Sequence, residues 1–429
     1  MSILIKNASY VVTQNKKRQI LKDVDIFIEN RTIEEIGKKL KEKAEHVING
    51  KDKVVLPGLI NLHTHSPMTL FRGFADDMNL HEWLFEKIDP VERKLNEEDV
   101  FCGAMLAGLE MIKSGTTSFL DMYFLTDEIA KAVQKTGMRG FLSLPIVESK
   151  FLTRHKDRIT MAEKFIKKWR GQSRIHPSVG PHSIYLCSGE TLQKSEELSK
   201  KYSTVLHIHV SETEKEVKDS KRKYGSSPVF YLKRLGVLSP RMIAAHSIWI
   251  SEQEIKVMAK FGVNVAHCPI SNMKLASGLA PVYQMIRNGV NVGLGTDSVA
   301  SNNNLNLFEE IKISALLQKM KHKNSKIVNA QEVLDMATVN GARALGMKNK
   351  LGSVEKGMLA DLITIDISKP HLYPVHDIVS HLVYSANGAD VNDTVVDGEI
   401  VMKDRKIMNV DEMETIHRFE SQVQNLFSR

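Results

Sequence analysis

Two histidines stand one residue apart where an apolar run ends, in "PGLINLHTHSPMTLFRG" at residues 57–73. In a β-strand, residues i and i+2 point to the same face, so His63 and His65 share one side of the strand. Two imidazoles placed in this way are suited to bind a metal ion. A chance pairing is the alternative, and the rest of the chain decides between the two.

Further ionisable side chains follow other strand-like runs, close to where each run ends. They are His182 in "GPHS", His209 and Glu212 in "HIHVSE", His246 in "AAHS", His267 in "AHCPISN" and Asp297 in "GTDS". A single histidine in a strand is more often a packed core residue than a ligand. Repetition at six strand ends favours a metal site, provided that the fold brings these ends together.

The central part of the chain alternates apolar strand-like runs with amphipathic helical segments. The runs are "VLPGLINLH", "TTSFLDMYF", "MRGFLSLPIV", "RIHPSVGPH", "STVLHIHVSE", "RMIAAHSI", "VNVAHCPISN" and "VNVGLGTD". Apolar strands joined by helical crossovers predict an α/β protein with a closed (β/α)8 TIM-like barrel, whose active site lies at the C-terminal strand ends. An open doubly wound sheet is the rival fold, but it usually carries a glycine-rich fingerprint that this chain lacks.

Both ends of the chain read instead as short strands and turns. Residues 1–57 contain "SILIKNASYVV" and "VDIFIEN", and residues 351–429 contain "KGMLADLITIDIS" and "DTVVDGEIVMKDRKI", where "VDGEIV" predicts a hairpin turn. We expect the two ends to form one small, discontinuous β-sandwich beside a metal-dependent barrel at residues 58–350. The segment "VDEMETIHRFESQVQNLF" predicts a C-terminal amphipathic helix.

Spacing suggests which residues would bind the metal. His63 and His65 supply two ligands from one strand, and His209 and Asp297 complete a set of three nitrogens and one oxygen. Such a set leaves room for water, as catalytic zinc sites require. Two-metal barrels often need a bridging lysine at the end of strand four, where this chain has His182, so one divalent ion is expected.

The remaining polar residues near the mouth have less certain roles. Glu212 lies three residues beyond His209, and a carboxylate that stands near the metal without binding it suits a proton shuttle. His207 shares a face with His209 but lies one layer deeper, so we expect a packed barrel histidine. Nothing in the sequence assigns a role to His267 or Asn272.

Composition excludes several classes of protein. The 429 residues, 42% hydrophobic and 26% charged, are typical of a soluble globular protein, with no run of the ~18 apolar residues that a membrane span needs. The start of the chain lacks a secretory-signal pattern, and Cys102, Cys187 and Cys268 are few and scattered, which predicts a cytoplasmic protein without disulfides.

The net charge of +8 raises the question of nucleic-acid binding. The one dense basic cluster, "KDSKRKYG", has no interleaved aromatic platform, and the other lysines lie on what resemble solvated helix faces. We therefore expect a small-molecule partner, with no nucleic acid and no membrane. A monomer and a homo-oligomer both stay open.

The longest motifs identify a family. From "PGLINLHTH" through "HIHVSE" and "GLGTDSVASNNNLNLFEE" to "GSVEKGMLADLITID", the chain resembles the amidohydrolase superfamily over nearly its whole length. Within it, "HTHSPMTLFRGFADDMNLHEWL", "GTTSFLDMYF", "GPHSIYLCS" and "SNNNLNLFEE" resemble the 5-methylthioadenosine/S-adenosylhomocysteine deaminases. Members of that group hydrolyse the 6-amino group of adenosine derivatives to give inosine derivatives and ammonia. Their metal is usually zinc, which the resemblance places at His63, His65, His209 and Asp297.

The resemblance also implies contacts with a nucleoside substrate. Glu92 would bind the ribose hydroxyls, and His182 and Glu212 would contact the substrate. Arg158, in a loop-like stretch, would face the anionic end of a homocysteine tail, and Trp83 lies where an aromatic ring could flank the nucleoside.

One departure concerns the 5′ end of the substrate. Some relatives carry an arginine near the end of strand three, where this chain has Leu144, which we expect to form an apolar wall. Methylthioadenosine, 5′-deoxyadenosine or adenosine would then be served at least as well as S-adenosylhomocysteine.

The implied mechanism is hydrolytic. Glu212 would take a proton from the attacking water and deliver it to N1 of the purine, while His246 and Asp297 hold the hydroxide. Guanine deamination and chlorotriazine hydrolysis are alternatives that keep the same metal ligands. A non-catalytic scaffold of the same fold is a further alternative, although such a relative would have lost ligands that this chain keeps.

Overall fold

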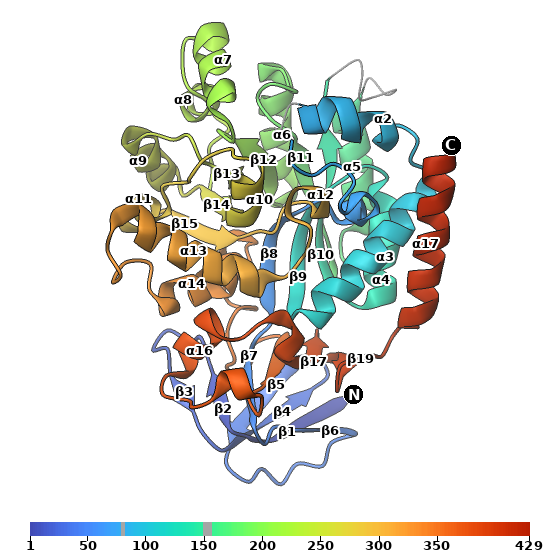
Figure 1. Cartoon of the computed structure of the whole chain (residues 1–429), viewed down its shortest axis with the longest axis vertical. Coiled ribbons are helices and arrows are strands. Elements are labelled where there is room, and N and C mark those ends of the chain that lie inside the picture. Colours follow the sequence, from blue (N-terminus) through green and yellow to red (C-terminus); the bar gives the residue numbers. More distant parts are fainter. Residues whose placement is uncertain (79–81, 149–156) are drawn as a thin grey trace.

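A curled, eight-stranded parallel sheet forms the centre of the molecule, with helices outside it and two smaller sheets below it (Figure 1). The computed structural model describes residues 1–78, 82–148 and 157–429. The barrel strands are neighbours in chain order: β8 (Leu59–Thr64), β9 (Thr116–Met122), β10 (Arg139–Ile146), β11 (Ile175–Pro181), β12 (Leu206–Val210), β13 (Met242–His246), β14 (Asn264–His267) and β15 (Asn291–Leu294). The predicted (β/α)8 fold class is confirmed.

The first and last barrel strands meet at the edge that carries the polar residues. Thr64 and Asp297 form a β-bridge, and the Asp297 amide donates to the His63 carbonyl oxygen at 2.8 Å. The two backbones approach so closely that a Cβ atom added to Gly295 would lie 2.8 Å from the Cβ atom of His63. The glycine of "GLGTD" therefore allows the segment with Asp297 to reach the strand with His63 and His65.

Helices cover the outer face of the barrel because each crossover carries an amphipathic segment. The helices between and after the barrel strands are α3 (Glu97–Lys113), α4 (Thr126–Thr136), α5 (Arg158–Trp169), α6 (Gly189–Tyr202), α7 (Glu214–Tyr224), α8 (Pro228–Arg234), α9 (Glu252–Phe261), α10 (Pro269–Lys274), α11 (Val282–Arg287), α12 (Val299–Asn302), α13 (Leu307–His322), α14 (Ala330–Ala337) and α15 (Val339–Ala344), of which α10 and α12 lie at the mouth. At the mouth, β8 is followed by η1 (Ser66–Phe71), and then by η2 (Trp83–Ile88) and α2 (Asp89–Glu92). None of the helices in the described ranges is long and apolar enough to cross a membrane.

Both ends of the chain meet below the barrel in two sheets. One has the order β5-β4-β1-β6, from β1 (Ser2–Ala8), β4 (Val24–Glu29), β5 (Thr32–Gly37) and β6 (His46–Asn49). The other has the order β19-β18-β17-β16-β7-β2-β3, from β2 (Tyr10–Val12), β3 (Ile20–Leu21), β7 (Lys53–Pro57), β16 (Leu362–Asp366), β17 (Val391–Val396), β18 (Glu399–Lys403) and β19 (Lys406–Ile407). Ile5, Ile28 and Val395 belong to one buried cluster drawn from both sheets. The domain boundaries after residues 57 and 350 stay a prediction.

Short elements complete this region, which Figure 1 shows beneath the barrel: η3 (Pro370–Leu372), α16 (Ile378–Tyr384) and η4 (Gly388–Asp390). Asp397 and Gly398, both with positive φ, connect β17 to β18 as the hairpin turn expected in "VDGEIV". Arg139 at the start of β10 is fully buried and donates to the carboxylates of Asp361 and Asp397 at 2.9 Å each. A buried guanidinium needs such partners, so this ion pair ties the barrel to the smaller sheets.

The C-terminal helix α17 (Glu412–Ser428) does not lie on the smaller sheets but along α3 of the barrel (Figure 1). Lys113 Nζ lies 2.6 Å from Glu412 Oε1 at one end of the helix, and Gln422 donates to Asp99 at 2.6 Å near the other. The helix thus closes the outer side of the barrel next to the mouth segment that carries Trp83 and Glu92.

Candidate active site

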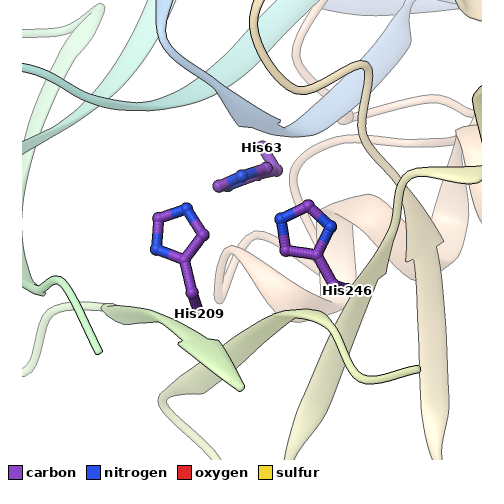
Figure 2. Close-up of side chains that lie close together, drawn as sticks. All are labelled: His63, His209 and His246. Atoms are coloured by element: carbon purple, nitrogen blue, oxygen red, sulfur yellow. The ribbon is translucent and has the colours of Figure 1, made fainter. Parts of the chain in front are cut away.

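Side chains of types that can bind a metal converge at the C-terminal ends of four barrel strands. His63 and His65 come from β8, His209 from β12 and His246 from β13, and Asp297 follows β15. The Nε2 atoms of His63 and His65 lie 3.3 and 3.4 Å from Asp297 Oδ1. Figure 2 shows the rings of His63, His209 and His246 around a common space, and their ligand atoms lie within 4.8 Å of one another.

These distances and the donor types fit a divalent metal ion. Four donors at ~2.1 Å around a tetrahedral ion lie about 3.4 Å apart, which matches the separations from Asp297 Oδ1. His63 Nε2 is buried and has no hydrogen-bond partner among the described residues. Burial lowers the pKa of His63 to about 4, so its imidazole is neutral at pH 7 and its lone pair is free to bind an ion.

Hydrogen bonds on the far side of each ring decide which nitrogen faces the centre. His65 Nδ1 donates to the Met122 carbonyl oxygen at 2.7 Å, and His209 Nδ1 donates to the His182 carbonyl oxygen at 2.9 Å. A carbonyl oxygen can only accept, so each proton is on Nδ1 and each Nε2 lone pair points inward.

Two residues that the sequence left without a catalytic role orient the other two rings. His207 Nε2 lies 2.7 Å from His63 Nδ1, so the expected packed barrel histidine also fixes a ring of the cluster. Asn272 Oδ1 accepts from His246 Nδ1 at 2.8 Å and leaves His246 Nε2 3.9 Å from Glu212 Oε1. His267 is buried at the end of β14, with no hydrogen-bond partner for either ring nitrogen in the described part of the chain.

Two serine hydroxyls that sequence reasoning missed hold the carboxylate of Asp297. Ser271 Oγ and Ser301 Oγ donate to Asp297 Oδ2 at 2.6 and 3.0 Å, which leaves Oδ1 for the histidines. Burial opposes ionisation of Asp297, but the neighbouring histidines outweigh it and hold the pKa of this carboxyl well below its usual range. The sequence signal that could have pointed to these two serines is their position, because "HCPISN" and "SVASNNN" directly follow strand ends.

Glu212 and His246 face each other with pKa values that are both raised. Burial raises the pKa of Glu212, and the nearby His246 opposes that change only in part. Burial lowers the pKa of His246, but the carboxylates of Glu212 and Asp297 outweigh it, so the net direction is upward. A carboxyl group whose pKa is raised towards neutrality is suited to give and take a proton at pH 7.

One cavity collects most of the predicted site residues. His65, Trp83, Glu92, His182, His209, Glu212, His246 and Asp297 all line it, and His63 is fully buried behind them. Met68, Leu84 and Ile88 give it an apolar side, as expected for a site that encloses an aromatic base. Glu92 lines this cavity at the end of α2, and burial raises its pKa.

Two residues expected at the 5′ end of a substrate are absent from the described lining of this cavity. Arg158 lies not in a loop but at the first position of α5, and its guanidinium is 5.7 Å from the ring of Phe124, which lines the cavity. Leu144 packs in an apolar cluster with Ile146 and Val179, so its expected role as a wall against the substrate is wrong. Leu144 is followed by Pro145, which does line the cavity, because successive strand residues point to opposite faces.

The contact between His207 and His63 predicts a role in metal affinity. His207→Gln should weaken Zn²⁺ binding by ~10–100-fold, because a ligating imidazole loses the partner that fixes its ring. Competition with a chromogenic chelator measures this change in the metal dissociation constant. The matched control is His176→Gln, which alters another barrel histidine that stacks on Phe141 and has no contact with the cluster. Equal loss in both variants, or none in His207→Gln, would contradict this role.

Comparisons with known proteins agree with this geometry. The chain matches the amidohydrolase family model over residues 54–401. It is 49% identical over 429 residues to a 5′-deoxyadenosine deaminase of Methanosarcina mazei, covering 100% of this chain and 99% of that protein. It is 43% identical over 432 residues to a 5-methylthioadenosine/S-adenosylhomocysteine deaminase of Thermoanaerobacter pseudethanolicus, covering 100% of both chains.

A solved structure extends the likeness to three dimensions. An adenosine deaminase from Xanthomonas campestris with bound zinc superposes with a TM-score of 0.96 at 33% identity, covering 100% of this chain and 99% of that one. The resemblance to the 5-methylthioadenosine/S-adenosylhomocysteine deaminases is confirmed, and the chain belongs to the amidohydrolase family.

Proposed function

We propose that this protein is a one-zinc hydrolase that removes the 6-amino group of adenosine derivatives and releases the inosine derivative and ammonia. The observation that carries the proposal is the meeting of two possible ligand groups that share His63, one with His65 and Asp297 and one with His209 and His246, at a cavity that Glu212 also lines. We assign His63, His65, His209 and Asp297 to the metal and leave Glu212 outside that ligand set. Similarity over the full length to deaminases of adenosine derivatives supports the choice of substrate. When bound, the ion supplies Lewis acidity that lowers the pKa of water towards ~7.

The protein's own groups then move the protons. Glu212 takes one from the attacking water and delivers it to N1 of the purine, which makes C6 electrophilic. His246 already donates from Nδ1 to Asn272, so it donates a second hydrogen bond from Nε2 to the attacking oxygen in its protonated form, which its raised pKa favours. Attack of the oxygen forms the C6–O bond. Asp297 then relays the remaining proton of that water from the new C6 hydroxyl group to the amine, so the C6–N bond breaks, ammonia leaves and N1 keeps the first proton.

The walls of the cavity suit a nucleoside. We assign the ribose hydroxyls to Glu92, whose carboxylate lines the cavity from α2. Trp83 is 6% exposed and presents an aromatic face beside it. Burial lowers the pKa of His182 to about 3, so this imidazole is neutral and can accept or donate one hydrogen bond to the substrate.

We propose that Arg158 binds the negatively charged tail at the 5′ end of S-adenosylhomocysteine. Its Nε atom is buried and has no hydrogen-bond partner among the described residues, and burial lowers its pKa. Arg158 is partly buried, and a guanidinium nitrogen buried without a partner is costly, so an anionic ligand would be favoured there. Methylthioadenosine and 5′-deoxyadenosine do not need this contact, and we propose that uncharged 5′ groups are served at least as well as the charged one.

We also propose a cellular compartment and a class of binding partner for this enzyme. The three cysteines are free and buried, which fits a reducing compartment and hence the cytoplasm. The partner is a small nucleoside rather than a nucleic acid, because the described cavity is lined largely by apolar and aromatic side chains around the histidine cluster.

Glu212→Gln tests the chemistry directly. The variant keeps shape and hydrogen bonding but cannot carry the proton, so ammonia release from a panel of adenosine derivatives should fall by ~10²–10⁴-fold with metal content unchanged. The matched control is Glu214→Gln, an exposed position two residues away that pairs with Lys218 and should keep full activity. Chelation should abolish wild-type turnover and a divalent ion should restore it. A Glu212→Gln enzyme with a near-normal rate would contradict the assignment of Glu212 as the proton carrier.

Arg158→Ala tests whether Arg158 binds the charged 5′ tail of the substrate. We expect kcat/KM for S-adenosylhomocysteine to fall by ~10–100-fold, the worth of a hydrogen bond to a charged group, while kcat/KM for methylthioadenosine stays unchanged. Arg170→Ala, just after the end of the same helix and over the Tyr202 ring, is the control. A strong wild-type preference for S-adenosylhomocysteine that survives Arg158→Ala would mean that its carboxylate is held elsewhere.

A further inference from the structure

The start of α7 departs from the capping pattern that this chain uses elsewhere. Three α-helices of the described ranges begin with a capping box, in which the acidic side chain at the third helical position accepts from the backbone amide of the cap residue: Asn96 with Asp99, Ser251 with Glu254, and Asn329 with Glu332. At α7 the cap is Thr213, which accepts from the Glu216 amide at 3.1 Å. The Glu216 carboxylate, however, reaches further back along the chain.

Glu216 binds the two residues that link β12 to the cap. Its Oε1 accepts from the Ser211 amide at 2.9 Å, and its Oε2 accepts from the Glu212 amide at 2.8 Å. Ser211 has φ 53°, a left-handed conformation that helps to turn the two consecutive amides towards one carboxylate. Glu216 is buried, and in the described part of the chain no lysine or arginine pairs with it.

The same short segment is held from its other side. The Ser211 carbonyl oxygen accepts from the amides of Ile248 and Trp249 at 3.0 and 2.9 Å, in the loop after β13. The peptide that carries Glu212 is therefore fixed between α7 and the neighbouring strand end. From it the Glu212 side chain extends to within 3.9 Å of His246 Nε2.

We propose that Glu216 is a positioning residue, which holds the backbone of Glu212 so that its carboxylate meets the water and the purine in one fixed geometry. This inference rests on the proposed function of Glu212 as the proton carrier. A displacement of about 1 Å at such a group is enough to cost ~10²-fold in rate.

Glu254 provides a matched control within the same chain. It is also buried at the third position of its helix, and it accepts from the Ser251 amide at 2.8 Å and from Ser227 Oγ. It caps α9 without touching the backbone of a proposed site residue, so Glu254→Gln reports the cost of an altered helix cap alone.

A double-mutant cycle separates positioning from simple stability. Gln offers one acceptor where Glu offers two, so Glu216→Gln should lower kcat on methylthioadenosine by ~10–100-fold, with KM and metal content little changed. In a Glu212→Gln background the same change should cost no more than ~3-fold, because the group it positions is already gone. Glu254→Gln should have the same small effect in both backgrounds. A Glu216→Gln enzyme with wild-type kcat, or with equal losses in both backgrounds, would overturn the proposal.

Amide hydrogen exchange gives a second readout that needs no turnover. The amides of Ser211 and Glu212 should exchange slowly in the wild type and at least ~10-fold faster in Glu216→Gln, but not in Glu254→Gln. Unchanged protection in Glu216→Gln would overturn the proposal even if the rate fell. If the wild type deaminated no adenosine derivative, the proposed function would fail, while this measurement would still decide whether Glu216 holds the Glu212 backbone.

Discussion

Burial of several imidazoles and carboxylates at one end of the barrel is the constraint on which the site depends. Polar groups taken out of water are costly unless each finds a partner. The outer nitrogens of His63, His65, His209 and His246 all have one, from His207, two backbone carbonyls and Asn272. The inner nitrogens and Asp297 then face one small space, where we propose that a divalent ion binds His63, His65, His209 and Asp297 while His246 Nε2 faces Glu212.

Closure of the barrel brings these buried polar groups close enough to serve as partners for one another. His63 and Asp297 are far apart in the chain, yet closure of the parallel sheet brings the first and last strands into contact, with a bridge between Thr64 and Asp297. The absence of a side chain at Gly295 allows the two backbones to approach. At the opposite end, Arg139 is neutralised by Asp361 and Asp397, so the charges that join the barrel to the smaller sheets are separated from those that do chemistry.

Much of this could be predicted from the sequence because strands follow a simple period. Residues two apart share a face, which brings His63 and His65 together, and parallel strands put their C-terminal ends at one mouth. The roles of Ser271, Ser301 and Asn272 could not be predicted, because they depend on the path of the loops that follow the strands. Leu144 was misplaced because a shift of one residue moves a strand side chain to the other face. Arg158 was expected in a loop because "HKDRIT" carries many polar residues, whereas Asp157 caps a helix that begins at Arg158.

The central claim is that one ion is held by three imidazoles and one carboxylate. Anomalous diffraction at the zinc edge, from crystals of the active, metal-loaded protein, tests it most directly. The account predicts a single peak at ~2.0–2.1 Å from Nε2 of His63, His65 and His209 and from a carboxylate oxygen of Asp297. Two peaks in the cavity, or an ion bound by a different set of side chains, would contradict it.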